Sequence, residues 1–161
     1  MRVGIGYDAH RLVKGTGMWL GGVYIKCNFS VLAYSDGDVI IHAIIDALLG
    51  AANLGDIGRK FPSHDPAYKD IAGAELLKRT QVLLEEKGKE IINIDATLIA
   101  ETPKIAEHTS LMEENISSYL KLDKISQINI KATTTDGLGF EGSKYGVSCQ
   151  AICLLKERDS E

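Results

Sequence analysis

The 161-residue chain contains only three cysteines, Cys27, Cys149 and Cys153, and they are scattered. So few thiols exclude a disulfide framework and a cysteine-based zinc site, and they are typical of a reducing compartment. No apolar run approaches membrane-spanning length, and the first residues show neither the apolar core of a secretory signal nor an Arg- and Ser-rich transit segment. We therefore expect a cytoplasmic protein that has no membrane partner.

Long basic stretches are also missing. The formal net charge is -4, and Lys and Arg form no run longer than a few residues, which argues against nucleic acid as a partner. An anionic substrate would have to be held by a few local groups. The chain has no internal repeat or low-complexity segment, and its length and composition fit a single domain over residues 1–161.

The stretch Ser35–Gly50, SDGDVIIHAIIDALLG, predicts a helix around which the other elements are arranged. Ser35 and Asp38 have the spacing of a capping box at its start. The residues that follow are apolar almost all the way round, so the helix should be buried on most sides. Asp38, His42 and Asp46 nevertheless fall four apart, which places one imidazole between two carboxylates. Buried polar groups need partners, so this line of side chains requires other parts of the chain.

Hydrophobic periodicity predicts the remaining elements. Strands are expected at Arg2–Tyr7, Ile92–Ala100, Ile128–Ala132 and Val147–Leu155, and Gly21-Gly22 predicts a hairpin between Met18–Leu20 and Val23–Ile25. Further helices are expected at Asp70–Lys87, with Val82 among its apolar residues and Gly88 as its stop, and after Pro103, with Ile105, Leu111, Met112, Ile116 and Leu120 facing inward. The order of elements predicts an α+β two-layer sandwich in which helices cover one face of a mixed sheet. The other sheet face is not clearly polar, which suggests burial against another subunit.

Three side chains form a candidate metal site. Asp8 and His10 lie two apart at the end of the first expected strand, so both project from the same face. Together with His42 they suit zinc and leave a fourth tetrahedral position open, as in catalytic zinc sites. Asp46 is either an acceptor for the His42 imidazole or only a helix-stabilising neighbour. The alternative to a zinc ligand is that His42 is a structural histidine held by its neighbours on the helix.

A second group of residues suits phosphate. The segment Lys131–Asp136, KATTTD, offers an ammonium, hydroxyls, backbone N–H groups and a carboxylate, which can hold a diphosphate and its divalent cation. The alternative is that the threonines only favour a strand and Lys131 is solvated. Lys104 follows Pro103 at an expected helix start, where free N–H groups also favour anions. Asp56 can accept from sugar hydroxyls or merely cap a turn.

Four motifs occur in order along nearly the whole chain: GIGYDAHR, SDGDVIIHAIIDALLGAANLGDIGRKFP, the PK pair, and NIKATTTDGLGFEG. Together they resemble 2-C-methyl-D-erythritol 2,4-cyclodiphosphate synthases, phosphorus-oxygen lyases of the non-mevalonate (MEP) isoprenoid pathway. The resemblance implies a homotrimer with active sites between neighbouring subunits and an apolar channel along the threefold axis. It implies that 4-diphosphocytidyl-2-C-methyl-D-erythritol 2-phosphate is cyclised by intramolecular phosphoryl transfer, with release of CMP.

The same resemblance assigns roles to residues. Asp8, His10 and His42 would bind one zinc ion per active site, and Asp136 would hold a second divalent cation, Mg²⁺ or Mn²⁺, with the substrate diphosphate. Thr134 and Tyr34 would be catalytic. The implied substrate-binding residues are Asp8, His10, Tyr34, Ser35, Asp56, Ile57, Gly58, Phe61, Asp65, Ala100, Lys104, Ile105, Ala106, Lys131, Ala132, Thr133, Thr134, Asp136 and Phe140.

This sequence departs from the family pattern at four positions. Tyr34 stands where the family usually has His, Asp136 where Glu is common, Ser63 where Asp is frequent, and Ser143 where Arg is frequent near the trimer axis. None of them belongs to the zinc triad. Two other functions stay open at this point: a zinc phosphohydrolase, for which Asp38 is the only obvious general base, and a trimeric scaffold that binds a metal or nucleotide without turnover.

Overall fold

The computed structural model describes residues 1–158, so residues 159–161 of the expected domain lie outside it. Five strands form the main sheet: β1 (Arg2–Lys14), β4 (Phe29–Leu32), β5 (Lys89–Ile99), β6 (Ile128–Thr133) and β7 (Gly146–Glu157). Their order is β4-β1-β7-β5-β6, and only the β5-β6 pair is parallel. The predicted mixed sheet is therefore confirmed.

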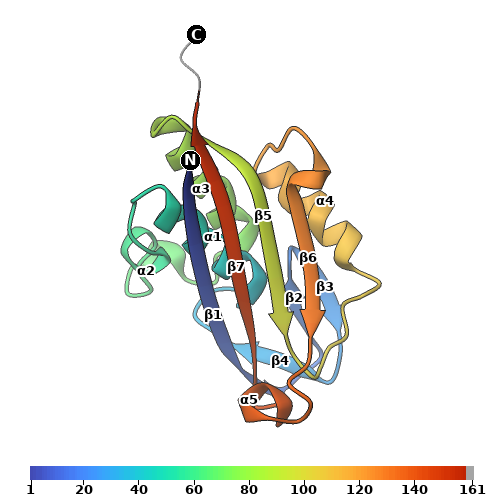
Figure 1. Cartoon of the computed structure of the whole chain (residues 1–161). Helices are drawn as coiled ribbons and strands as arrows, with labels where there is room; N and C mark the ends of the chain where they lie inside the picture. The colour runs from blue at the N-terminus through green and yellow to red at the C-terminus, as the bar shows by residue number, and fades with distance from the viewer. Residues whose placement is uncertain (159–161) are drawn as a thin grey trace.

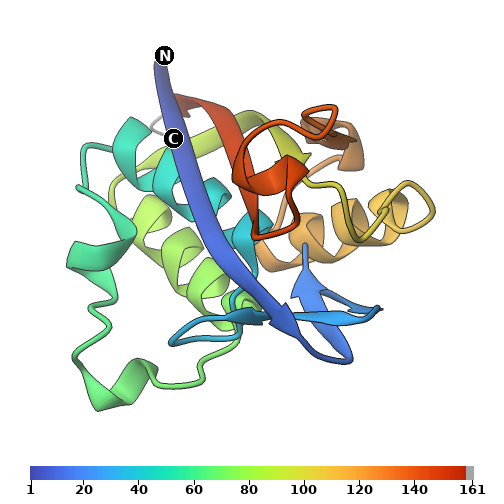
Figure 2. The same ribbon diagram turned by 90° about the horizontal axis from the view of Figure 1, so that it is seen from below.

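Three longer helices cover one face of this sheet (Figures 1 and 2). They are α1 (Val39–Ala51), α3 (Gly73–Glu86) and α4 (Thr109–Tyr119). The short helices are α2 (Ile57–Lys60), η1 (Pro66–Tyr68), η2 (Ile125–Gln127) and α5 (Gly139–Gly142), and β2 (Gly17–Leu20) pairs with β3 (Val23–Lys26) in a separate hairpin. The α+β class is confirmed. No helix within residues 1–158 is long and apolar enough to cross a membrane.

Helix α1 forms the centre of the core, as its sequence predicts. Nearly all of its side chains are buried, between the sheet and α3. Two glycines of β1 make the close approach possible: a Cβ on Gly4 would lie 2.0 Å from the carbonyl oxygen of Ala47, and one on Gly6 would lie 2.0 Å from that of Ala43. The helix is therefore buried within one chain, without the need for a partner subunit.

The start of α1 differs from the prediction. Asp38, and not Ser35, is the N-cap, and its carboxylate accepts from the N–H of Ile41 at 3.1 Å. The same carboxylate accepts from the N–H groups of Gly21 and Gly22, each at 2.8 Å. These glycines form the tight turn between β2 and β3, with φ of 59° and 75°. The hairpin prediction is confirmed, and Asp38 ties this hairpin to the helix.

Several other boundaries also differ. Pro103 does not open a helix: it lies in a loop, where its peptide bond with Thr102 is cis, and α4 begins only at Thr109. Strand β1 continues to Lys14, beyond its predicted end at Tyr7, and β4 was not predicted from the sequence. Helix α3 begins three residues after Asp70 and ends at Glu86, one residue before the predicted end, and the predicted stop Gly88 follows with a φ of 61°.

Individual core assignments differ for local reasons. A register irregularity between Ile91 and Asn93 buries Ile91 in place of Ile92. The side chains of Val82 and Leu111 lie on the solvent side of their helices. The predicted inward-facing residues of β7 are buried, as are Ile128 and Ile130 of β6.

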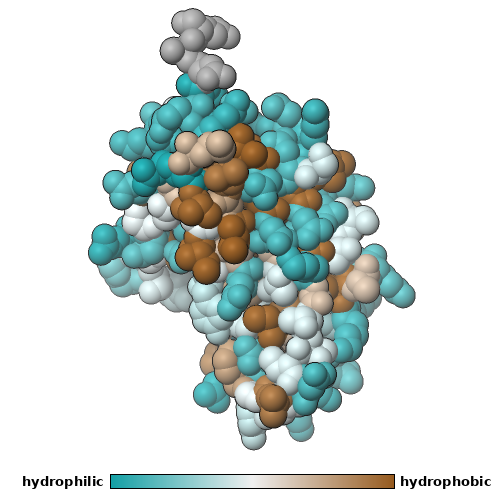
Figure 3. Space-filling model, viewed as in Figure 1, coloured by the Kyte–Doolittle hydropathy of each residue, from teal (hydrophilic) through white to brown (hydrophobic). Residues whose placement is uncertain are grey.

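The face of the sheet that carries no helices is apolar along its centre. Val3 and Ile5 in β1 are each 70% exposed, and Tyr7 and Ile152 are each 50% exposed. Hydrophobic side chains gather on this face above β1 and β7 (Figure 3). The prediction of a weakly polar outer face is confirmed.

Candidate functional site

Strand β1 and helix α1 bring the three predicted metal ligands together. Asp8 Oδ2 lies 2.8 Å from Nε2 of His10 and 3.1 Å from Nδ1 of His42, and the two imidazole nitrogens lie 3.2 Å apart. Metal–ligand bonds of about 2.0–2.1 Å in a tetrahedron place ligand atoms roughly 3.3 Å from one another. The three atoms therefore already have the spacing of ligands to a single ion, and they form a candidate metal site.

The electrostatics of this triad favour a cation. Burial alone would raise the pKa of Asp8, but its hydrogen bonds with His10 and His42 and their charges hold that pKa at about 2. Burial alone would lower the pKa of His42, but the hydrogen bond with Asp8 and the carboxylate charges around it raise that pKa. Surroundings that stabilise positive charge on a buried imidazole also suit a bound metal ion.

The second nitrogen of His42 finds a partner that the sequence analysis did not predict. Its Nε2 lies 3.3 Å from Oγ of Ser35 and 4.0 Å from a carboxylate oxygen of Asp36. Asp46 does not contact the imidazole, because its carboxylate accepts from the N–H of Ile57 at 3.1 Å and so holds the start of α2. Of the two alternatives for Asp46, a hydrogen bond to the imidazole is therefore not observed within residues 1–158.

A cavity of about 190 Å³ opens beside the triad. Of the predicted substrate-binding residues, it brings Tyr34, Ser35, Ile57, Gly58 and Phe61 together with His10 and His42, and Ser63 also lines it. Tyr68, Ile71 and Leu76 also line its wall, and in the sequence only the apolar residue types of that segment indicate them.

The segment that closes this cavity is held by local contacts. The Tyr34 hydroxyl donates to the carbonyl oxygen of Asp65 at 3.4 Å, and the Asp65 carboxylate accepts from the N–H of Ala67 at 2.9 Å. The rings of Phe61 and Tyr68 meet edge to face, with their centroids 5.6 Å apart. Tyr34 therefore links the metal side of the cavity to the 61–68 segment.

Other predicted substrate residues line a different cavity, of about 280 Å³, at the neighbouring ends of β5 and β6. Its walls comprise Ala100, Pro103, Lys104, Ile105, Ala106, Ala132, Thr133 and Thr134. These strands are parallel, so their carboxyl ends meet at one edge of the sheet. Phe140 lines a third cavity with His10, Arg11 and Tyr145. Within one chain, the predicted substrate residues therefore fall into separate hollows.

Three charged residues of the predicted site already have partners. Lys131 pairs with the carboxylate of Asp95 across β5 and β6. Asp56 caps α2, where its carboxylate accepts from the N–H of Arg59 at 2.8 Å. Asp136 adopts a φ of 53° in an exposed turn, and its carboxylate lies 3.4 Å from the hydroxyl of Thr134. Of the two alternatives for Asp56, capping is therefore observed.

The fold and the triad define an α+β protein with a candidate metal centre that opens into a small cavity. The sequence model of the YgbB family matches residues 1–156. The chain belongs to this family.

Named relatives share most of the chain. A 2-C-methyl-D-erythritol 2,4-cyclodiphosphate synthase of Clostridium perfringens is 52% identical over 96% of this chain and 99% of its own length. The structure of Plasmodium falciparum IspF in complex with CDP is 38% identical, with a TM-score of 0.86 over 98% of this chain and 97% of that one. The bifunctional IspDF of Campylobacter jejuni is 41% identical, with a TM-score of 0.93 over 98% of this chain, which corresponds to 42% of the bifunctional protein.

Proposed function

We propose that this chain converts 4-diphosphocytidyl-2-C-methyl-D-erythritol 2-phosphate to 2-C-methyl-D-erythritol 2,4-cyclodiphosphate and CMP, as a metal-dependent phosphorus-oxygen lyase of the MEP pathway in the cytoplasm. The convergence of Asp8, His10 and His42 beside a cavity is the observation that carries this proposal. The names of relatives that match almost end to end support it.

In the proposed reaction, an oxygen of the 2-phosphate forms a bond to the β-phosphorus of the same molecule. The bond from that phosphorus to the bridging oxygen breaks, and CMP leaves with this oxygen and its electron pair. The product is an eight-membered cyclic diphosphate. A protein base is not required, because a phosphate is already ionised at neutral pH, and well-oriented intramolecular attack can contribute roughly 7–11 kcal/mol.

Asp8, His10 and His42 would hold zinc, which would supply a Lewis acid that orients and neutralises the attacking phosphate. Ser35 would donate to a phosphate, and Asp136 would hold the second cation, Mg²⁺ or Mn²⁺. Tyr34 and Thr134 would position the reacting phosphates. The 61–68 segment, with Phe61 and Asp65, would exclude water from the erythritol.

Other residues would hold the cytidine end. Lys104, Ile105 and Ala106 line a cavity together with Ala100, Ala132, Thr133 and Thr134, and backbone groups there would cradle the base. The relative crystallised with CDP supports a ligand of this class. Lys131 would reach the diphosphate only after its ion pair with Asp95 breaks and the substrate takes the place of that carboxylate.

We infer that the complete site forms between copies of the chain in a homotrimer. The metal triad and the cytidine residues line separate cavities of one subunit, and a neighbouring copy that placed its cytidine residues beside this triad would complete the site. The exposed apolar residues Val3, Ile5 and Ile152 offer a surface for that assembly.

The alternative function, a zinc phosphohydrolase, would need Asp38 as its general base. Asp38 is fully buried and accepts hydrogen bonds from the N–H groups of Gly21, Gly22 and Ile41. A carboxylate committed to three backbone donors is not available to activate water at the metal. The structure therefore favours cyclisation over hydrolysis.

The test is CMP release from the CDP-linked substrate, measured with metal-stripped and metal-reloaded protein. We expect release to require the metal, to be lost in His42→Ala, and to be kept in Asp46→Asn, a matched change one turn further along α1. Release of inorganic phosphate would favour the hydrolase. If folded, metal-loaded protein binds CDP but does not turn over the substrate, the result would favour the non-enzymatic scaffold that binds a metal or nucleotide.

A further inference from the structure

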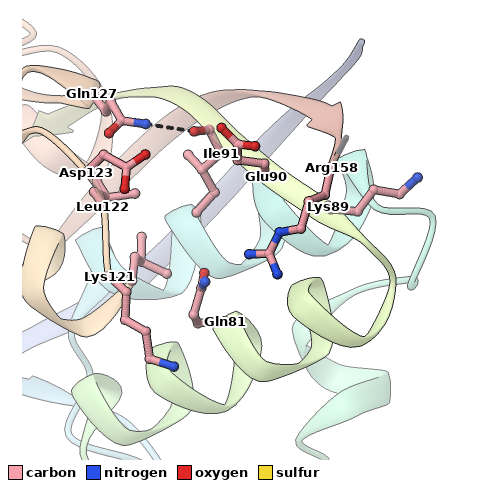
Figure 4. Close-up of a pocket in the computed structure, with 10 residues that line it drawn as sticks. Gln81, Lys89, Glu90, Ile91, Lys121, Leu122, Asp123, Gln127 and Arg158 are labelled. Atoms are coloured by element: carbon pink, nitrogen blue, oxygen red, sulfur yellow. Dashed lines mark hydrogen bonds between the residues drawn. The ribbon is translucent and has the colours of Figure 1, made fainter. Parts of the chain in front are cut away.

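A cavity of about 210 Å³ lies at the end of the sheet where β5 begins and β7 ends (Figure 4). Its walls come from α3, the start of β5, the segment after α4 and the end of β7. No residue of the triad or of the proposed substrate site lines it. This cavity is therefore a second candidate site.

The new site lies far from the metal centre. In the sheet, His10 pairs with Val147 of β7, whereas Lys89 in the wall of the cavity pairs with Glu157. Ten residues of β7 separate these two registers, and a strand rises about 3.3 Å per residue, so the two registers lie roughly 33 Å apart along the sheet. A ligand here would not touch the reacting groups.

The cavity contains a buried acceptor that has no donor. Gln81 in α3 is only 8% exposed, and its Nε2 donates to Glu85 at 3.2 Å. Its amide oxygen, Oε1, is buried and has no hydrogen-bond partner within residues 1–158. Exchange of the two amide atoms would turn the oxygen toward a carboxylate, so the present orientation is the favourable one. Buried acceptors are nearly always satisfied, and a ligand with an N–H group would satisfy this one.

Most of the charges around the cavity are already paired. Lys89 pairs with Glu157, Lys121 pairs with Glu85 at 3.2 Å, and Lys156 pairs with Glu90 at 3.2 Å. Among the residues of the cavity wall, one cation and one anion make no ion pair within the described range 1–158.

These two are Arg158, directly after β7, and Asp123, after α4, and both residues are exposed at the cavity. Neither side chain makes a hydrogen bond or ion pair with another residue in the range 1–158 that the structure describes. Figure 4 shows the guanidinium of Arg158 reaching into the cavity beside Gln81, with Asp123 on the other wall. The rest of the wall includes the aliphatic side chains of Ile91 and Leu122.

We propose that this cavity binds a small aliphatic zwitterion of the amino-acid class. The ligand carboxylate would pair with the guanidinium of Arg158, and the ammonium would donate to Gln81 Oε1 and to the carboxylate of Asp123. The aliphatic part would contact Ile91 and Leu122. The buried Gln81 oxygen then gains a donor, and the exposed charges of Arg158 and Asp123 gain charge-assisted hydrogen bonds, which neither a simple anion nor a simple cation provides together.

The test compares three probes that differ by one charge: L-leucine, leucinamide, which lacks the carboxylate, and 4-methylpentanoate, which lacks the ammonium. Binding to the full, metal-loaded protein is followed by NMR shifts of the Gln81 side-chain amide and the Arg158 Nε–H. We expect saturable binding of leucine that is at least tenfold tighter than that of either analogue. Absence of saturable leucine binding, or equal binding of all three probes, would overturn the proposal.

Variants assign the contacts. Arg158→Gln and Asp123→Asn should each weaken leucine binding at least tenfold, and Gln81→Met should do so if it folds. Lys87→Gln is the matched control, because Lys87 is an exposed cation at the end of α3 that does not line the cavity. Leucine binding that Arg158→Gln and Asp123→Asn leave unchanged would overturn the proposal, as would an equal loss in the control.

Discussion

Oδ2 of Asp8 in β1 lies 3.1 Å from Nδ1 of His42 in α1, although 34 residues separate the two in sequence. This contact joins the first strand of the sheet to the central helix at the point where His10 also arrives. It makes the candidate metal site a product of tertiary packing.

The first prediction concerns metal binding. Asp8→Asn should lower zinc affinity at least tenfold, because the amide supplies no negative charge to the ion and no longer orients the two imidazoles. The measurement is a competition titration with a chromophoric chelator. Asp46→Asn, which preserves an acceptor for Ile57 N–H, should keep wild-type affinity. Equal affinities for wild type and Asp8→Asn would show that the triad is not the metal site.

The second prediction concerns the packing of α1 on β1. Gly6→Ala should destabilise the protein by about 3 kcal/mol, because its Cβ would lie 2.0 Å from a helix carbonyl oxygen and the core would have to shift. Gly50→Ala should instead stabilise it by about 0.5–1 kcal/mol, since that position is in the helix with nothing within 4 Å of a Cβ. Urea unfolding of both variants measures the difference. Similar effects of the two substitutions would contradict the close approach.

The third prediction concerns pH. The hydrogen bond with Lys131 lowers the pKa of Asp95. A carboxyl whose pKa is lowered in the folded state stabilises the protein above its unfolded pKa of about 3.9, and this stabilisation is lost as the pH falls through the folded value. The pair is about half exposed, so its contribution should stay below about 1 kcal/mol.

Asp95→Asn should therefore destabilise the protein slightly at neutral pH, and the difference from wild type should vanish in acid below the folded pKa. Urea midpoints measured along a pH series provide the comparison. If the difference in urea midpoint between wild type and Asp95→Asn grew as the pH fell, the result would contradict a lowered pKa of Asp95.

The fourth prediction concerns the shared site. His42→Ala and Thr134→Ala should each be inactive alone, because each removes a group from one half of the proposed site. Mixed assemblies made by co-expression should recover up to about a quarter of the wild-type rate, since some interfaces then combine two intact halves. No recovery from well-mixed assemblies would place both halves in one subunit.

Local patterns predicted much of the fold. The all-round apolar sequence of α1 predicts its central burial, the two glycines predict the hairpin, and alternation predicts β7. The metal triad was also predictable. Asp8 and His10 project from the same face of one strand, and His42 lies on a buried helix, where its polar side chain needs partners.

The parts that sequence reasoning missed depend on long-range contacts. Asp38 serves as the N-cap because its carboxylate also binds the turn at Gly21 and Gly22, which no local spacing reveals. Asp46 binds Ile57 and not His42 for the same kind of reason. At the irregularity after Ile91, Ile91 is buried in place of Ile92, whereas Ile94, Ala96 and Leu98 are buried as predicted, and only strand pairing determines this local change.

The most direct test of the proposed function is phosphorus NMR of the metal-loaded protein with 4-diphosphocytidyl-2-C-methyl-D-erythritol 2-phosphate. We predict two mutually coupled resonances of a cyclic diphosphate, which appear together with one equivalent of CMP. A signal of inorganic phosphate, or an unchanged substrate spectrum from folded protein that carries its metal, would contradict the cyclisation.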